Sequence, residues 1–345
     1  MDMSLTDEQQ QLAKVERSWL QRHDSVDRLR KTLDSGGLTL APEAIQHAAE
    51  SGLLGLLTPE MGGTHADLAV VSEVHGHAAS CLPIADLAMA GWVLGQVRAA
   101  SAEAAVSGKS LFGIARRDAR MPGQSTPVPM AADLAGVVIV DSSEAGEHAL
   151  LLENPDLVDM STLDLTRTWG RARIDESAAY RRPLPIGTVA FVRDALVVHR
   201  SLDALGAAAH LLDMTVTYAS QREQFGAPIG SFQAVKHHCA NMEVSVQASR
   251  SLLYASARSL DSDNPIARAR LAAAGAAYAK SAAAEVAGTA LQVHGGIGFT
   301  WEHDLHLFLR RIKVDQAMDG TVAEHRAALA ALQTELSSLP SHSAR

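Results

Sequence analysis

Cysteine, aromatic residues and positive charge are scarce in this sequence of 345 residues. Its two cysteines, Cys81 and Cys239, are too few for a disulfide framework and are consistent with a reducing cytosol. The formal net charge of −9 provides no basic stripe for a nucleic acid backbone, which disfavours that partner. No run reaches the ~18 apolar residues of a membrane span, and the acidic N-terminus lacks the pattern of a secretory signal. The sequence therefore predicts a soluble, cytoplasmic protein.

Helical periodicity dominates the first and the last parts of the chain. Hydrophobic residues make up 47% of the sequence and aromatic residues only 4%, which is typical of a helical protein rich in alanine and leucine. Thr6 is a candidate N-cap for a first helix, and Pro42 begins another that ends near Gly52. In the last part, the alanine-rich segments 202–220, 232–259 and 266–293 have the lengths of bundle helices.

The middle of the chain has a different pattern. Residues 136–140 and 149–152 are short β-branched or aliphatic runs between polar turns, and prolines interrupt any long helical period. This pattern predicts a small, mostly antiparallel sheet domain. The predicted domains are an N-terminal helical domain at 1–108, a β domain at 109–190, a helical bundle domain at 191–335 and a frayed tail at 336–345.

Two segments of the last third each join a helical stretch to a glycine-containing turn. In 222–226 (Arg-Glu-Gln-Phe-Gly), Arg222 offers a planar donor fork that suits phosphate. In 292–300 (Gln-Val-His-Gly-Gly-Ile-Gly-Phe-Thr), Gly295 and Gly296 allow a ligand to approach backbone N–H groups. Because these glycines follow a helix and not a strand, they do not form a Rossmann fingerprint. Together the segments predict a phosphorylated cofactor or substrate held between helices.

The order helical, β, helical, together with these two motifs, resembles the acyl-CoA dehydrogenase family of flavoproteins. Residues 4–9 and 59–63 are also similar to that family. The resemblance implies a mainly α fold with a small, truncated β domain and a C-terminal four-helix bundle. It also implies FAD as cofactor and an acyl-CoA as substrate. In the family, a carboxylate removes the α-proton of the thioester while the β-hydrogen leaves as hydride to the flavin.

The resemblance also implies which residues bind the cofactor. In the family, the two motifs contact the adenosine and pyrophosphate end of an FAD whose flavin ring lies mainly in the adjacent subunit. The corresponding residues here are Arg222, Gln224 and Phe225 in the first motif and Gln292, Gly295 and Gly296 in the second. The structural alternative is a salt-bridged helix end and an ordinary turn of the bundle.

The motifs that line the flavin ring in the family are missing. Many members carry a Thr-Glu-Pro stretch leading to Gly-Ser-Asp, and then a Trp followed closely by Thr/Ser-Asn. Residues 111–120 occupy the first place and contain neither pattern, and Trp169 lies in a different context. The β region is also shorter than is usual in the family. The chain is therefore predicted to have lost the flavin-ring half of the site and kept the adenine half.

Asp319 is the candidate catalytic base. It directly precedes Gly320-Thr321, where the family commonly has Glu, and it is one methylene shorter. A displacement of about one ångström can cost ~100-fold in rate. The family's other position for the base corresponds to Leu196 and Val197, which are apolar, and Asp194 is expected on roughly the opposite face of that helix. The alternative explanation for Asp319 is a helix cap beside Gly320.

These departures suggest that the chain resembles the shorter, degenerate subunit of heteromeric bacterial acyl-CoA dehydrogenases of the sterol-catabolic type. The implied partners are a second dehydrogenase-like chain in a heterotetramer, an acyl-CoA substrate and an electron-transferring flavoprotein. One alternative is a self-sufficient homo-oligomeric dehydrogenase with Asp319 as base, and another is a structural helical subunit without flavin. His303 and His306 lie one helical turn apart but lack a third ligand, so no metal site is predicted.

Overall fold

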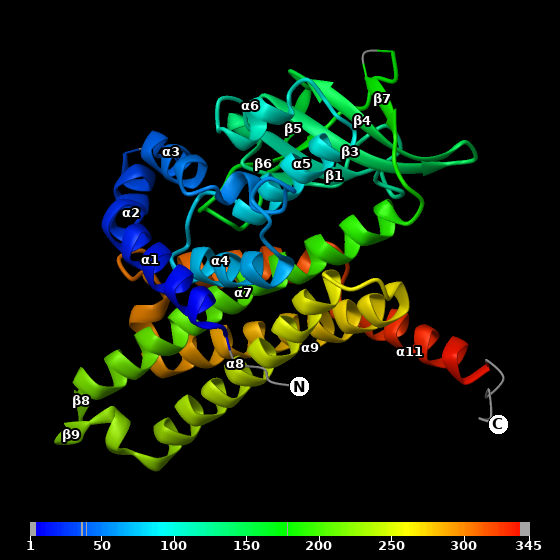
Figure 1. Ribbon diagram of the computed structural model, residues 1–345. Helices are drawn as coiled ribbons and strands as arrows, with labels where there is room; N and C mark the ends of the chain where they lie inside the picture. The colour runs from blue at the N-terminus through cyan, green and yellow to red at the C-terminus, as the bar shows by residue number, and fades with distance from the viewer. Residues whose placement is uncertain (1–4, 36, 39, 178, 339–345) are drawn as a thin grey trace.

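The computed structural model describes residues 5–35, 37–38, 40–177 and 179–338 (Figure 1). Helices form the first and last parts of the chain, and a small β region lies between them. The predicted mainly α fold with a small sheet region is confirmed. Ser4 of the N-terminal motif and residues 339–345 of the predicted tail lie outside the described residues.

The N-terminal part consists of short helices. Thr6 caps the first of them: its hydroxyl accepts from the Gln9 amide, while the Gln9 side chain accepts from the Thr6 amide. The predicted N-cap is therefore correct. Pro42 begins α3 as predicted. The helices are α1 Asp7–His23, α2 Val26–Asp34, α3 Pro42–Glu50, α4 His65–His77, α5 Ile84–Gln96 and α6 Ala102–Val106, with a 3-10 turn, η1, at Leu53–Gly55.

Two small sheets form the middle part. The larger has the strand order β1-β3-β4-β7, in which β1 and β3 are parallel and the other neighbours antiparallel. The smaller has the order β2-β6-β5 and is antiparallel. Both predicted aliphatic runs lie inside strands, β3 and β4. The strands are β1 Phe112–Arg116, β2 Val128–Pro129, β3 Gly136–Ser143, β4 Gly146–Glu153, β5 Leu157–Asp159, β6 Trp169–Ala172 and β7 Tyr180–Pro183, with a 3-10 turn, η2, at Ala131–Asp133.

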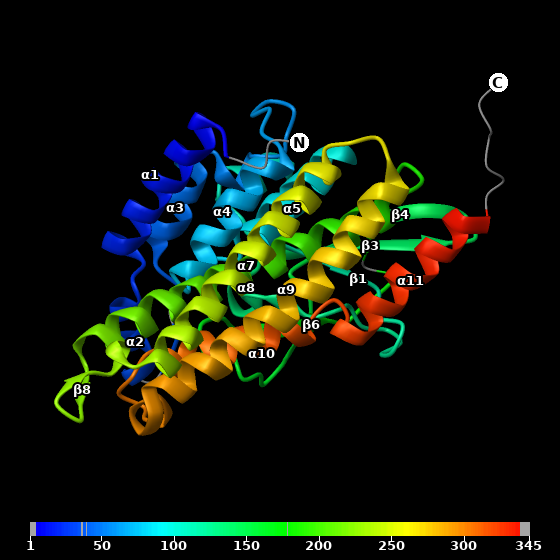
Figure 2. The same cartoon turned by 90° about the horizontal axis from the view of Figure 1, so that it is seen from below.

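Long helices form the last part, and α7, α8, α9 and α10 pack against one another as a bundle (Figure 2). A small hairpin of β8 and β9 joins α7 to α8, and α11 lies against α9. The elements are α7 Thr188–Gln221, β8 Glu223–Gln224, β9 Ala227–Pro228, η3 Ile229–Ser231, α8 Gln233–Leu260, α9 Pro265–His294, η4 Gly295–Phe299, α10 Leu305–Ala317 and α11 Val322–Ser338.

One hydrophobic core runs through all three parts of the chain. Leu94 of α5, Val138 of β3, Leu205 of α7, Ala287 of α9 and Phe308 of α10 belong to the same buried cluster. The β region is therefore packed onto both helical parts and not tethered beside them. Among the helices of the described residues, none combines the length and the apolar composition that crossing a membrane requires.

Two glycines bring α4 and α7 into backbone contact. A Cβ on Gly76 would lie 2.0 Å from the Asp203 carbonyl oxygen, and a Cβ on Gly206 would lie 2.0 Å from that of Glu73. No side chain fits there, because both clashes involve backbone atoms. This contact joins the N-terminal helices to the bundle.

Gly206→Ala therefore forces α4 and α7 apart. We expect the free energy of unfolding to fall by about 1–3 kcal/mol, the usual cost of overpacking a well-packed core. Gly288→Ala is the matched control, because Gly288 is an exposed residue of α9 whose added Cβ would meet no atom within 4 Å. That control should stabilise the protein by about 0.5–1 kcal/mol. Urea unfolding of both variants measures the difference, and equal stability would contradict the close contact.

Candidate active site and cofactor-binding turns

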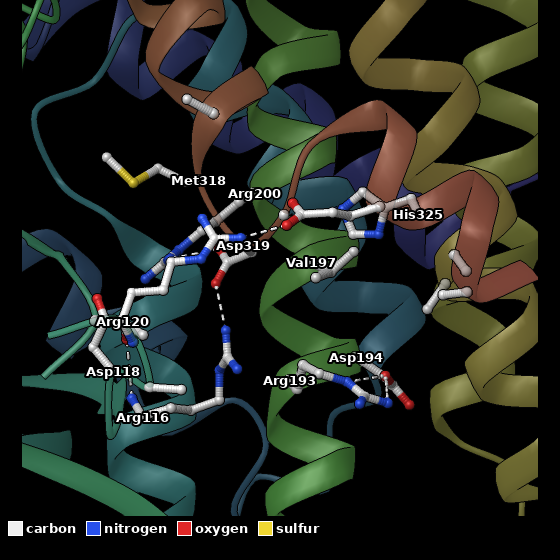
Figure 3. Close-up of a pocket in the computed structure, with 18 of the residues that line it drawn as sticks. Arg116, Asp118, Arg120, Arg193, Asp194, Val197, Arg200, Met318, Asp319 and His325 are labelled. Carbon is white, nitrogen blue, oxygen red and sulfur yellow. Dashed lines mark hydrogen bonds and ion pairs between the residues drawn. The ribbon is translucent and has the colours of Figure 1, made fainter. Parts of the chain in front are cut away.

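A cavity of about 830 Å³ lies between α7, α9, the loop after β1 and the turn that joins α10 to α11 (Figure 3). Its lining includes the predicted base, Asp319, and also Val197 and Asp194. Several arginines line it as well, among them Arg116 and Arg200. The cavity is therefore a charged space, and the contacts of Asp319 decide what it can do.

Asp319 is held between two arginines (Figure 3). Its carboxylate accepts from Arg200 Nη1 at 2.6 Å and from Arg116 Nη2 at 3.3 Å, and its side chain is 4% exposed. Burial alone would raise the pKa of Asp319. The charges of Arg200, Arg116 and Lys280 and the Arg200 hydrogen bond outweigh that effect and lower the pKa to about 2.

Arg200 also binds a second carboxylate. Its Nη2 donates to Asp86 of α5, so that one buried guanidinium joins α5 to the α10–α11 turn. Burial opposes the charge on Arg200, but Asp319 and Asp86 together raise the pKa of the guanidinium. A carboxylate with a pKa near 2 has little affinity for a proton at neutral pH. The role of Asp319 as base stays a prediction, and this environment weighs against it.

The second family position for a base is apolar: Leu196 is in the core, and Val197 lines the cavity. Asp194 lines the same cavity, so its expected place opposite this position is correct relative to Leu196 and wrong relative to Val197. The reason is that two residues along a helix point to opposite sides, whereas three residues return to nearly the same side. It accepts from Arg193 at 2.9 Å and from Arg268 at 3.0 Å. Asp194 is thus another carboxylate engaged by arginine.

The first cofactor motif forms a hairpin at the far end of the bundle, which we call the Arg222 hairpin (residues 222–228). Its two-residue loop, Phe225-Gly226, has φ values of 55° and 80°, typical of a type I′ turn. A positive φ is strained for a bulky residue, and the Phe225 side chain is 94% exposed. Gln224 is exposed beside it. None of the described residues forms a hydrogen bond or ion pair with the exposed Arg222 guanidinium. The hairpin therefore presents an aromatic ring and a cation that has no partner in the part of the chain that the structure describes.

The second motif ends α9 in an exposed turn, which we call the glycine turn (residues 295–301). Gly295 has φ 60° and ψ −140°, a conformation almost restricted to glycine. A Cβ on Gly295 or Gly296 would meet no atom within 4 Å, so the surface is open there. Gln292 is exposed one turn earlier on α9.

The structure brings the two motifs to one end of the bundle. The Tyr218 ring, near the end of α7, stacks on the His294 ring at the end of α9, with 4.5 Å between centroids. Figure 2 shows the hairpin and the orange turn at the same end of the molecule. Arg200 lies about 30 Å away along α7, at ~1.5 Å of rise per residue. The predicted cofactor residues are therefore gathered together, and Asp319 belongs to a different place.

The residues that sequence reasoning missed are Arg116 and Arg200, which bind Asp319, and Asp86, which binds Arg200. The available signal was an arginine in an otherwise apolar stretch of α7, because such a buried cation requires a carboxylate partner. The two histidines considered as metal ligands contact other aromatic rings: His306 stacks on Trp301, and His303 contacts the His294 ring edge-on. Within the described residues, no three His, Cys, Asp or Glu side chains form a metal-binding group.

Comparison with known proteins identifies the family. The family model described as the acyl-CoA dehydrogenase C-terminal domain matches residues 195–332. Acyl-CoA dehydrogenase IpdE2 is similar over 89% of this chain and 93% of its own length in Mycolicibacterium smegmatis, at 28% identity. In Mycobacterium tuberculosis, IpdE2 is 39% identical over 152 residues, 44% of each chain. FadE34 of M. tuberculosis is 32% identical over 90% of this chain, which spans about half (46%) of FadE34. The chain belongs to the acyl-CoA dehydrogenase family.

Solved structures agree with this assignment at the level of the fold. The ChsE4–ChsE5 complex from Mycobacterium tuberculosis matches 99% of this chain and 100% of its own, with a TM-score of 0.85 and 21% identity. A variant of a protein described as the Tcur3481–Tcur3483 steroid ACAD matches 96% of this chain and 99% of its own, with a TM-score of 0.84 and 21% identity. A helical part, a β part and a second helical part, in this order, are thus the fold of the family.

The Asp319 contacts predict a pH-dependent contribution to stability. Asp319→Asn removes the charge between Arg200 and Arg116, and we expect a loss of about 3 kcal/mol at pH 7, because a buried partner is left unpaired. The pKa is lowered from 3.8 to about 2 in the folded protein. The carboxylate therefore stabilises the fold above pH 4, and this contribution disappears as the pH falls from 4 to 2.

Urea unfolding of the natural protein and of Asp319→Asn from pH 7 to pH 3 measures the effect. The stability difference should be constant above pH 5 and narrow below pH 4. A constant difference throughout that range would contradict an ion-paired Asp319 with a lowered pKa.

Proposed function

We propose that this chain is a subunit of an FAD-dependent acyl-CoA dehydrogenase, and that it supplies the helical scaffold and the contacts to the adenine side of FAD. The observation that carries the proposal is the separation of the two predicted halves of the site. The cofactor motifs lie at one end of the bundle, and Asp319 lies about 30 Å of helix away. A chain that holds the cofactor's tail at the far end from its own cavity serves the cavity of another chain, which could be a second copy or a different partner. The binding of Asp319 by two arginines favours the different partner.

The residues at the bundle end suit the tail of a dinucleotide. The Arg222 guanidinium is exposed and unpaired among the described residues, and a planar donor fork suits a pyrophosphate. The open surface over Gly295 and Gly296 admits a ligand close to the backbone. Phe225 supplies an exposed aromatic face, which a nucleotide base or a partner chain would cover. These features support FAD as the cofactor.

The chain's own cavity is poorly suited to the chemistry. When bound, FAD supplies the acceptor for the hydride that leaves the β-carbon of the acyl-CoA. A base must remove the α-proton in the same reaction, and a carboxylate between two guanidiniums is poorly basic. Arg116 lies within residues 111–120, the stretch where the family's flavin-ring motif is missing. We therefore assign the base and the flavin-ring pocket to a partner chain.

The partner is a second acyl-CoA dehydrogenase-like chain, in a heterotetramer. Two neighbours in fold support a two-chain arrangement, since each is named as a pair of different proteins, ChsE4–ChsE5 and Tcur3481–Tcur3483. The second is called a steroid ACAD, which supports a sterol-derived CoA thioester as the substrate class. An electron-transferring flavoprotein is the electron acceptor in this proposal.

Arg222→Ala tests the cofactor contact. The variant should strip FAD from the complex with the partner chain, because the cation at the pyrophosphate is lost, and we expect at least a tenfold weaker affinity. Arg22→Ala is the control: Arg22 is an exposed arginine of α1 that donates to the Ser18 carbonyl of its own helix. Flavin absorbance of the purified complexes reports occupancy. Unchanged occupancy in Arg222→Ala would refute the contact.

Asp319→Asn in the complex tests which chain holds the base. Turnover per bound flavin should stay within a few-fold of the natural complex, because the partner supplies the carboxylate. Removal of a general base lowers the rate by about 10²–10⁴-fold. A loss of that size in an assembled, flavin-loaded complex would instead support the homo-oligomeric alternative with Asp319 as base. Normal assembly of a complex that carries no bound flavin would support the structural alternative.

A further inference from the structure

The glycine turn is exposed and has few contacts inside the bundle. Phe299 is 75% exposed, Ile297 45% and Trp301 47%, and only Gly298 is buried, against Leu291 and Leu305. A turn with so little buried surface is prone to local opening. A site that binds a cofactor through backbone groups requires that those groups stay in a fixed position. Something outside the bundle must therefore hold the turn.

An arginine from the N-terminal helices makes that contact. Arg30 of α2 donates through Nε to Asp304 at 2.9 Å, through Nη2 to the same carboxylate, and through Nη1 to the Trp301 carbonyl. Its guanidinium carbon lies 5.5 Å from the centre of the Trp301 ring. The Arg30 side chain is only 16% exposed. One guanidinium thus binds both Trp301, the last residue of the glycine turn, and Asp304, the residue directly before α10.

Trp301 is tied by further contacts although it lies at the surface. Its indole N–H donates to Asp34 of α2 at 3.1 Å, and its ring stacks on His306 at 4.8 Å between centroids. Two residues of α2, Arg30 and Asp34, therefore hold one tryptophan by its carbonyl, its ring face and its ring nitrogen. The last residue of the glycine turn is fixed from the N-terminal part of the chain.

We propose that Arg30 is a positioning residue for the glycine turn: it fixes the backbone between His294 and Asp304 and so prepares the surface that receives the anionic tail of the cofactor. The inference rests on the proposed function for the ligand, but the fixing of the turn does not. The Arg30 guanidinium places two donors on one Asp304 oxygen and a third on the Trp301 carbonyl. A lysine cannot reproduce this planar arrangement of donors. The N-terminal helices are in this way part of the cofactor site without touching the cofactor.

Hydrogen exchange of the chain alone tests the first half of the inference. Arg30→Ala should raise amide exchange in residues 296–301 by about tenfold or more, because the turn loses its main anchor. Arg28→Ala is the control, since Arg28 lies on the same helix and pairs with Asp24 at 2.5 Å, away from the turn. Equal exchange in the natural protein and Arg30→Ala would overturn the inference. So would an equal rise in both variants, because it would mean that loosening of α2 in general opens the turn.

The affinity of the complex for FAD tests the second half. Flavin fluorescence recovery on dilution should give a dissociation constant about tenfold higher for Arg30→Ala, a size typical of coupling between neighbouring sites. The Arg28→Ala complex should keep the natural value. If Arg222→Ala weakens FAD and Arg30→Ala does not, the inference fails and the proposed function stands. If neither variant weakens FAD, the proposed function itself fails.

Discussion

The buried charges of α7 are the constraint on which the rest of the structure depends. Arg200 binds Asp86 of α5 and Asp319 of the α10–α11 turn, and one turn further on Asp203 binds Arg167 of the β region and Arg311 of α10. Burying any one of these charges without its partner would cost much free energy, so the paired residues must be buried together when the protein folds. The register of α5, the β region and α10 against α7 is therefore fixed by charge as well as by apolar packing. Because Asp319 takes part in this network, the main role of its carboxylate is structural: it pairs with the buried arginines.

This arrangement separates two tasks that a catalytic site must combine. At one end of α7, guanidiniums engage Asp319, the carboxylate that the family comparison suggests as a base, and also Asp194 of the same cavity. At the other end, an arginine that is unpaired among the described residues, an exposed phenylalanine and an open glycine turn lie together on the surface. A protein complete in itself would be expected to leave a base free and to cover its apolar side chains. The surfaces exposed here are consistent with a chain that completes another.

Local signals in the sequence predicted most of the fold. Thr6 and Pro42 mark helix starts that depend only on neighbouring residues, and the β-branched run at 136–140 lies in a strand because its pattern is also local. The residues predicted to bind the cofactor lie together at one end of the bundle, and their role stays a proposal. The ion pairs were not predictable, because 119 residues separate Arg200 from Asp319 and 274 separate Arg30 from Asp304. The face of Asp194 was a different kind of error, since helical periodicity alone places it beside Val197.

The most direct measurement is native mass spectrometry of this chain, alone and co-purified with a partner dehydrogenase chain, since it reports stoichiometry and bound flavin together. We expect the chain alone to carry no FAD, and the mixed assembly to be a heterotetramer with FAD bound. A homo-oligomer of this chain that carries one FAD per protomer would contradict the account.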